Sequence, residues 1–341
     1  MVDVCGGGWI PAFAGMTKGT GGGILPRLKP AGSRPDIAVN PHSVIIHSMD
    51  LSVVIPVYNA ERYVESAVDS ALRQKEVAEI ILVEDKSPDN ALEICRRLEQ
   101  EHPRVKLFQH SDGGNHGAGE SRNLGIRKAG CEYIAFLDAD DYYLDNCFSK
   151  AAEVLENDPG LDGVYGAVGA EFENEEAKRR YFLTHHDEMA TVDEWVTPEQ
   201  LFHYLVLGRA GYIHLNGLVV KKTGLLDVGL LPELRLHQDM ALTVKLAAKL
   251  RLATGQVDTP VSIRRLHLDN RITNLKTDFS VTQFQAYQYL LNWSRQEPLS
   301  SEKQKIIRTR YWSLGLRRHR KEKNLPAALY YYAALHLFGV K

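Results

Sequence analysis

Three carboxylates at the end of one apolar run are the residues best placed to do chemistry. Asp138, Asp140 and Asp141 directly follow residues 133–137, which have the composition of a buried strand. Strands end at solvent, so these side chains are expected at the carboxyl end of a parallel strand, where open α/β sheets bind ligands. Like charges this close need a cation or donors to neutralise them. Because Mg²⁺ binds one or two carboxylates together with substrate phosphates, the segment predicts an enzyme that holds a metal-bound phosphate ligand.

A structural alternative stays open for the same residues. Asp140 or Asp141 could cap a helix expected at residues 142–155, because an Asp side chain accepts hydrogen bonds from the first backbone N–H groups of a helix. The acidic cluster alone does not decide between these two roles. The elements around it must supply the rest of the argument.

Those elements alternate between apolar strands and amphipathic helices. Strands are expected at residues 51–57, 79–83, 105–109 and 133–137, and helices at 60–73, 89–100 and 118–129. This order predicts a parallel, doubly wound α/β sheet. Weaker patterns predict strands within 162–170, 212–220 and 257–264, and helices at 197–207, 239–250 and across 276–341.

The bulk composition limits the class of protein. A chain of 341 residues can bury a full core, and its net charge of -2 excludes strong whole-molecule attraction to nucleic acid. Its four cysteines show no C-x-x-C spacing, which argues against a zinc site or a disulfide framework and fits a cytoplasmic protein. Residues 1–48 are rich in Gly and Pro without periodicity, so we expect a disordered or non-native extension, with Met49 as a candidate start of translation.

Four segments in order resemble the family 2 glycosyltransferases, which have the GT-A fold. They are residues 53–59 (Val-Val-Ile-Pro-Val-Tyr-Asn), 81–87 (Ile-Leu-Val-Glu-Asp-Lys-Ser), 121–126 (Ser-Arg-Asn-Leu-Gly-Ile) and 136–141 (Phe-Leu-Asp-Ala-Asp-Asp). The resemblance implies a GT-A fold with a mostly parallel doubly wound sheet. It also implies a nucleotide-sugar-binding half at 49–160, an acceptor-binding half with the catalytic base at 161–275, and a helical C-terminal extension at 276–341.

The resemblance also implies a nucleotide-binding set. Its members are Pro56, Val57, Tyr58, Asn59, Asp85, Arg122, Asp138 and Ala139. Asp85 would accept a hydrogen bond from the uracil N3–H, since an ionised carboxylate is acceptor-only; a plain turn residue is the alternative. The family turn is usually Asp-Asp-Gly-Ser, whereas this chain has Lys86 in place of the glycine.

Metal, base and phosphate roles follow from the same resemblance. Asp140 would ligate Mg²⁺ or Mn²⁺, and His267 would be a second metal ligand or a phosphate contact. Asp239 would be the catalytic base, although Gln238 replaces the family's usual Glu before it. Arg265 and Arg271 would neutralise the leaving diphosphate. The structural alternative for Asp239 is a carboxylate favoured at a helix N-terminus.

Together these roles imply an inverting, metal-dependent hexosyltransferase that uses a nucleotide-sugar, most simply a UDP-sugar. Two rivals remain, namely a nucleotidyltransferase and a non-catalytic nucleotide-sugar-binding or scaffold protein. Residues 305–341 combine basic and apolar side chains, which suits peripheral contact with the inner face of an anionic membrane. The alternative is a helix that packs on the core with a solvated basic face. Membrane contact would favour a lipid-linked saccharide acceptor in surface polysaccharide synthesis.

Overall fold

The computed structural model describes residues 49–183, 187–268, 270 and 279–339. The expectations for residues 1–48 and for Arg271 therefore fall outside the described residues. The described chain is built around a seven-stranded sheet with strand order β3-β2-β1-β4-β8-β6-β9. Its strands are β1 (Leu51–Val57), β2 (Val77–Glu84), β3 (Val105–Gln109), β4 (Tyr133–Phe136), β6 (Gly163–Tyr165), β8 (Leu218–Lys221) and β9 (Leu252–Thr254).

The sheet is parallel except for β8, which runs antiparallel to both β4 and β6. All seven residues of β1 are buried, as expected for a central strand covered on both faces. Side chains alternate across the pleat, so Val54 enters one core while Val53 and Ile55 enter the other. The predicted doubly wound sheet is confirmed.

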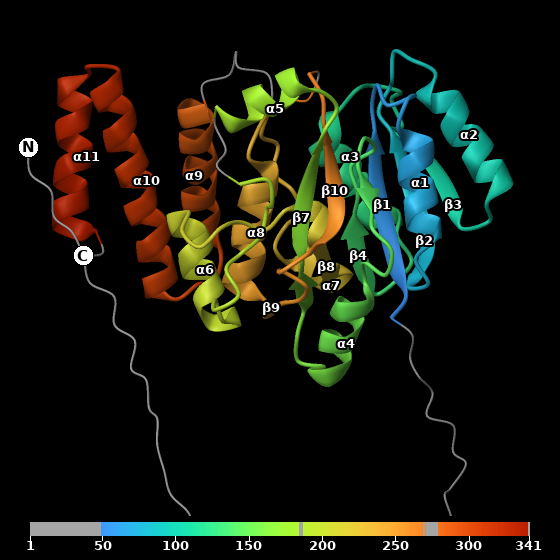
Figure 1. The fold of residues 1–341 in the computed structure, drawn as a ribbon. Coiled ribbons are helices and arrows are strands. Elements are labelled where there is room, and N and C mark those ends of the chain that lie inside the picture. The colour runs from blue at the N-terminus through green and yellow to red at the C-terminus, as the bar shows by residue number, and fades with distance from the viewer. Residues whose placement is uncertain (1–48, 184–186, 269, 271–278, 340–341) are drawn as a thin grey trace, which may run out of the picture. The chain divides into compact units, whose positions relative to one another are not determined.

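Helices cover both faces of the sheet (Figure 1). One core includes residues of α1 (Val64–Leu72), α2 (Ala91–Glu101) and α4 (Ser149–Asn157). The other includes residues of α3 (Gly117–Lys128), α6 (Pro198–Leu207), α8 (Gln238–Lys249) and α9 (Phe279–Gln296). Helix α3 approaches β1 closely at Gly125, where a Cβ would lie 2.4 Å from Val54 Cγ1.

A second sheet corrects one expectation. Its three strands are β5 (Tyr142–Tyr143), β10 (Pro260–Leu266) and β7 (Ala167–Phe172), in the order β5-β10-β7. The helix expected at 142–155 therefore begins only at Ser149. Tyr143 is buried and its hydroxyl donates to the Phe136 carbonyl (2.6 Å). Aromatic residues favour such half-buried pleated positions, so the chain after the acidic cluster is extended rather than helical.

The remaining helices complete the second half. They are α5 (Glu175–Phe182), α7 (Lys222–Asp227), α10 (Ser301–Lys321) and α11 (Leu325–Phe338), with a short 3₁₀ helix, η1, at Leu215–Gly217. The strand expected at 212–220 begins only at Leu218, since β8 covers Leu218–Lys221. Helix α6 begins as predicted, because Thr197 and Gln200 form a capping box. Across the described residues, every helix is too short or too polar to cross a membrane.

Candidate active site

Arg122 joins two carboxylates that are far apart in the sequence. It lies on α3 with a buried side chain, and its guanidinium donates to Asp138 Oδ1. Its second terminal nitrogen, Nη1, lies 3.6 Å from Asp239 Oδ1. Burial alone would lower the pKa of Arg122, but the charges of Asp138 and Asp239 raise it above its usual value. The guanidinium therefore stays charged and links the acidic loop after β4 to helix α8.

Asp239 lies in the first turn of α8, where the helix dipole favours a carboxylate. The helix starts after His237, whose φ of 64° lies in the left-handed region and turns the incoming loop into the helix. Gln238 packs against α3, because a Cβ on Gly119 would lie 2.6 Å from Gln238 Oε1. The glycine at position 119 leaves room for the end of the Gln238 side chain, so α3 and α8 contact each other at this point. Asp239 follows Gln238 in the sequence, and its carboxylate lies beside Arg122.

Asp140 and His267 lie side by side as possible metal ligands. His267 Nε2 is 3.4 Å from Asp140 Oδ2, and neighbouring ligands of one octahedral cation at its usual bond length lie about 3 Å apart. The imidazole stacks on Tyr63, with ring centroids 5.3 Å apart. Asn270 Nδ2 also donates to Asp140 Oδ2 (3.0 Å). This donor pair fits a divalent cation.

No larger metal cluster occurs in the described part of the chain, where no group of three or more His, Cys, Asp or Glu side chains is arranged to hold an ion. The donor pair would therefore leave most coordination positions to phosphate oxygens and water. That arrangement is the usual one for Mg²⁺ in substrate complexes.

Asp141 is buried and does not cap a helix, so that alternative is wrong. Its Oδ1 accepts from the Arg265 backbone N–H (2.8 Å) and its Oδ2 accepts from Asn216 Nδ2 (2.6 Å). Burial, together with the charges of Asp140 and Asp138, raises its pKa well above the usual value. Asp141 thus ties the acidic loop to β10 and η1.

Asn216 is a residue that sequence reasoning missed. Its Oδ1 accepts from the backbone N–H of Asp138 (3.2 Å) while its Nδ2 donates to Asp141. Its own backbone N–H donates to Nδ1 of the partly buried His214 (3.2 Å). Burial lowers the pKa of His214 to about 3, so the ring stays neutral and can accept. The Leu-Asn-Gly sequence of η1 offers no signal that would have revealed this role.

Asp85 lies at the carboxyl end of β2 and holds the segment at residues 111–119, which contains four glycines. Its two carboxylate oxygens accept from the backbone N–H groups of His116 (2.7 Å) and Gly117 (2.7 Å). The preceding Glu84 accepts from the Ser87 N–H (2.5 Å) and so closes the turn. Lys86 adopts a φ of 58° there, which is the conformation that a glycine would adopt without strain.

Two members of the predicted nucleotide-binding set lie in strand β1 and not in the loop that follows it. Pro56 and Val57 belong to β1 and are buried, so the exposed loop starts at Tyr58 and Asn59. Pro56 lies beyond the last residue pair of the β1–β4 ladder, Val54 and Phe136, at the end of the strand, where a proline is tolerated.

The remaining predicted residues lie near the acidic loop. Ala139 is buried within it. Arg265 Nη1 donates to the Asp140 carbonyl (3.4 Å), and its guanidinium lies over the Tyr142 ring at 4.6 Å. Arg271 lies outside the described residues.

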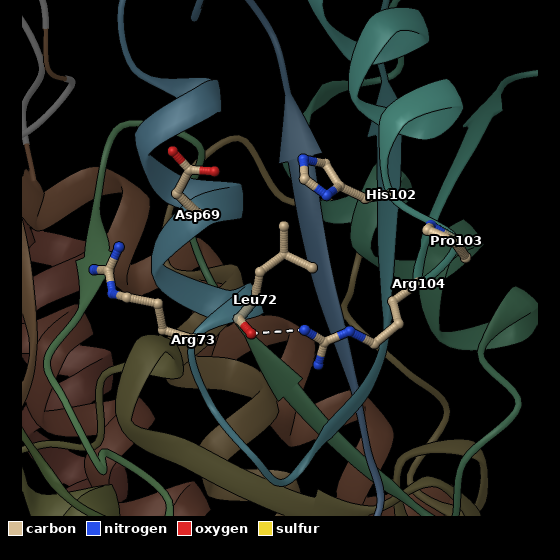
Figure 2. A pocket seen from close by; sticks show the side chains of 6 residues that line it. All are labelled: Asp69, Leu72, Arg73, His102, Pro103 and Arg104. Atoms are coloured by element: carbon tan, nitrogen blue, oxygen red, sulfur yellow. Dashed lines mark hydrogen bonds between the residues drawn. The ribbon is translucent and has the colours of Figure 1, made fainter.

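A separate hollow lies near the amino ends of β2 and β3, away from this chemistry (Figure 2). Its lining residues are Asp69, Leu72, Arg73, His102, Pro103 and Arg104. Arg104 donates to the carbonyls of Leu72 (2.7 Å) and Val77 (2.8 Å), so its charge is used to join α1 to β2.

The model of glycosyl transferase family 2 matches residues 52–212. This part of the chain belongs to that family. The chain is 35% identical over 134 residues to the glycosyltransferase EpsJ of Bacillus subtilis. This match covers 39% of this chain and 37% of EpsJ. It is 40% identical over 97 residues to a poly(ribitol-phosphate) beta-glucosyltransferase of Bacillus spizizenii. This match covers 28% of this chain and 15% of that protein. The matches thus span well under two thirds of these relatives.

The fold of the chain is also found among solved structures. S. aureus TarS 1–349, in complex with UDP-GlcNAc, aligns with a TM-score of 0.61 over 83% of this chain and 79% of the TarS 1–349 chain, at 18% identity. A second crystal structure of TarS 1–349 aligns with a TM-score of 0.58 at the same identity. The expected GT-A fold is confirmed.

Proposed function

We propose that this protein transfers a sugar from a nucleotide-sugar, with UDP as the nucleotide, to a hydroxyl of a saccharide or lipid-linked saccharide. The observation that carries the proposal is the bridge from Arg122 to both Asp138 and Asp239, beside the pair Asp140 and His267. In this proposal, the donor site and the candidate base share one region. Relatives named for teichoic acid synthesis and for poly(ribitol-phosphate) glucosylation support a role in surface polysaccharide synthesis.

Asp239 is proposed as the general base. Its carboxylate is half-exposed, so an acceptor hydroxyl can reach it from solvent, and Arg122 fixes its position. A positioned carboxylate of this kind can take the hydroxyl proton as the oxygen attacks the anomeric carbon. With one base and no enzyme nucleophile, the displacement is direct and inverts the anomeric centre.

Asp140 and His267 are proposed to hold the metal. A bound Mg²⁺ or Mn²⁺ would stabilise the charge that develops on the leaving nucleoside diphosphate. An imidazole ligand favours Mn²⁺ over Mg²⁺. Arg265 carries a positive charge beside this pair and would contact the diphosphate, as would Arg271.

The nucleotide is proposed to lie along the loops after β1 and β2. Each Asp85 oxygen accepts one backbone N–H and keeps one lone pair, so the carboxylate can still accept from the uracil N3–H. Tyr58 and Asn59 line the same edge, and Asp138 would contact the ribose. In the proposed division, residues 49–160 provide the donor site and residues 161–275 provide Asp239 and His267. The proposed location is the cytoplasm.

The test is UDP release from a panel of UDP-sugars, measured with Mn²⁺ and with EDTA. We expect metal-dependent release from one donor. Binding of UDP without turnover of any donor, with or without saccharide acceptors, would favour a non-catalytic binding protein. Failure to bind UDP would refute uridine as the nucleotide. Release of diphosphate from a nucleoside triphosphate and a sugar phosphate would instead favour a nucleotidyltransferase.

A further inference from the structure

Helix α11 exposes an apolar face to solvent. The face consists of Leu325, Leu329, Tyr330, Tyr332, Ala333 and Leu337, all exposed. Leu325 and Leu337 keep 68% and 73% of their surface accessible. At 3.6 residues per turn, these positions form one continuous arc of the helix, and Ala328, Tyr331 and Ala334 form the opposite arc. We call the exposed arc the α11 face.

The opposite arc packs on α10. Gly315 of α10 permits a close approach, because a Cβ there would lie 2.4 Å from the Tyr331 ring. The hydroxyls of Tyr311 and Tyr331 lie 3.2 Å apart. Figure 1 shows α10 between α11 and α9. Helix α11 contains no Asp, Glu, Lys or Arg, and a helix that is apolar all round normally lies in a core or a membrane.

The sequence left two alternatives open for residues 305–341, namely membrane contact and packing on the core with a solvated basic face. The two helices of this segment differ in which alternative they fit. Helix α10 packs on the core through Ile306, Ile307 and Leu314 and exposes a basic side, as the packing alternative predicts. Helix α11 does not follow that pattern. Among the described residues, six of the thirteen exposed large hydrophobic side chains lie on its 14 residues.

Cations gather at one end of the α11 face. Between residues 317 and 323 the chain has five cationic side chains and one carboxylate. The carboxylate, Glu322, accepts from Arg318 Nε (2.9 Å) and lies 3.0 Å from His319 Nδ1. The exposed cations Arg317, Arg320, Lys321 and Lys323 form what we call the basic turn. A compact positive charge thus adjoins an apolar and aromatic surface.

We propose that the α11 face and the basic turn dock on an anionic membrane surface. Apolar and aromatic side chains bury at the boundary between headgroups and acyl chains, and nearby cations bind the anionic headgroups. A second copy of the chain fits less well, because its α11 would offer no carboxylate to the basic turn. The inference rests on charge and exposure at α11 and is independent of the proposed transferase activity.

The test is co-sedimentation of the full chain with phosphatidylcholine vesicles, with and without phosphatidylglycerol. We expect binding only to the anionic vesicles, weakened by added salt. A variant with Arg317→Gln, Arg320→Gln and Lys323→Gln should bind about 100-fold more weakly, since each cation near an anionic surface contributes about fivefold. A variant with Leu329→Ser and Leu337→Ser should lose about tenfold or more.

A matched control changes exposed side chains elsewhere, with Lys75→Gln, Arg96→Gln and Leu226→Ser, and should bind as the wild type does. All variants should release UDP in vesicle-free solution at the wild-type rate, which separates this test from that of the proposed function. The proposal is wrong if the wild type does not bind anionic vesicles, or if the α11 variants bind unchanged. A dimer in solution that Leu329→Ser and Leu337→Ser dissociate, without vesicle binding, would assign the face to a second copy and also overturn it.

Discussion

The bridge at Arg122 predicts two unequal coupling energies. Its guanidinium is buried and makes a charge-assisted hydrogen bond to Asp138, whose side chain is 30% exposed. Asp239 is 47% exposed and lies 3.6 Å away. A hydrogen bond to a charged group contributes about 1.5–3 kcal/mol, whereas an ion pair exposed on one side contributes below about 1 kcal/mol. The coupling of Arg122 to Asp138 should therefore exceed its coupling to Asp239.

The single changes should also differ. Asp138→Asn removes the negative charge that pairs with the buried guanidinium of Arg122, so we expect a loss of about 3 kcal/mol in the free energy of unfolding. Arg122→Met removes the buried charge itself and keeps the aliphatic volume, while both carboxylates retain contact with water. Its expected loss is smaller, about 1–2 kcal/mol.

The assay is urea unfolding of two double-mutant cycles, Arg122→Met with Asp138→Asn and Arg122→Met with Asp239→Asn. Coupling near 2 kcal/mol in the first cycle and below about 1 kcal/mol in the second would support the described geometry. Equal couplings, or none in the first cycle, would refute it. Because the readout is stability, the result does not depend on knowing the sugar or the acceptor.

Three further predictions concern stability. Burial lowers the pKa of Lys245 to about 8 in the folded protein, whereas the pKa of a lysine in the unfolded chain is about 10.4. Between these two pH values the unfolded state binds more protons than the folded state. The free energy of unfolding therefore rises with pH across this window. Relative to Lys245→Met, the wild type should gain about 3 kcal/mol in the free energy of unfolding from pH 7 to 11; parallel pH profiles would contradict this. Lys86→Gly should raise the free energy of unfolding by about 1 kcal/mol, because the backbone of Lys86 has the left-handed conformation that glycine adopts without strain. A lower thermal midpoint for this variant would show that reasoning to be wrong. Gly125→Ala should cost about 1–2 kcal/mol by overpacking Val54, and unchanged urea unfolding would contradict the close contact between α3 and β1.

The first half of the fold was predictable because its elements are set by local pattern. Strands β1 and β3 match their expected bounds exactly, since a continuous apolar run between turn residues has few other solutions. The extended segment at Tyr142 was not predictable. Its hydrogen-bonded partner is β10, more than a hundred residues later in the sequence, and no local signal encodes such pairing.

The site divides in the same way. The residue types of the acidic loop and of Arg122 were readable, but the bridge from Arg122 to Asp239 depends on the packing of α3 against α8. The role of Asn216 depends on η1 lying beside the acidic loop, and the burial of Asp141 depends on β10. The exposed face of α11 was also not predictable, because composition alone does not tell which apolar helix the other described residues leave uncovered.

The central claim is that Asp239 acts as a base in a site that binds a nucleotide-sugar. The most direct measurement is UDP release by the wild type and by Asp239→Asn, with UDP affinity measured by calorimetry on both. The account predicts that Asp239→Asn binds UDP about as tightly as the wild type and loses at least about 100-fold in the rate of UDP release. Full release by the variant, or loss of UDP binding equal to the loss of rate, would contradict it.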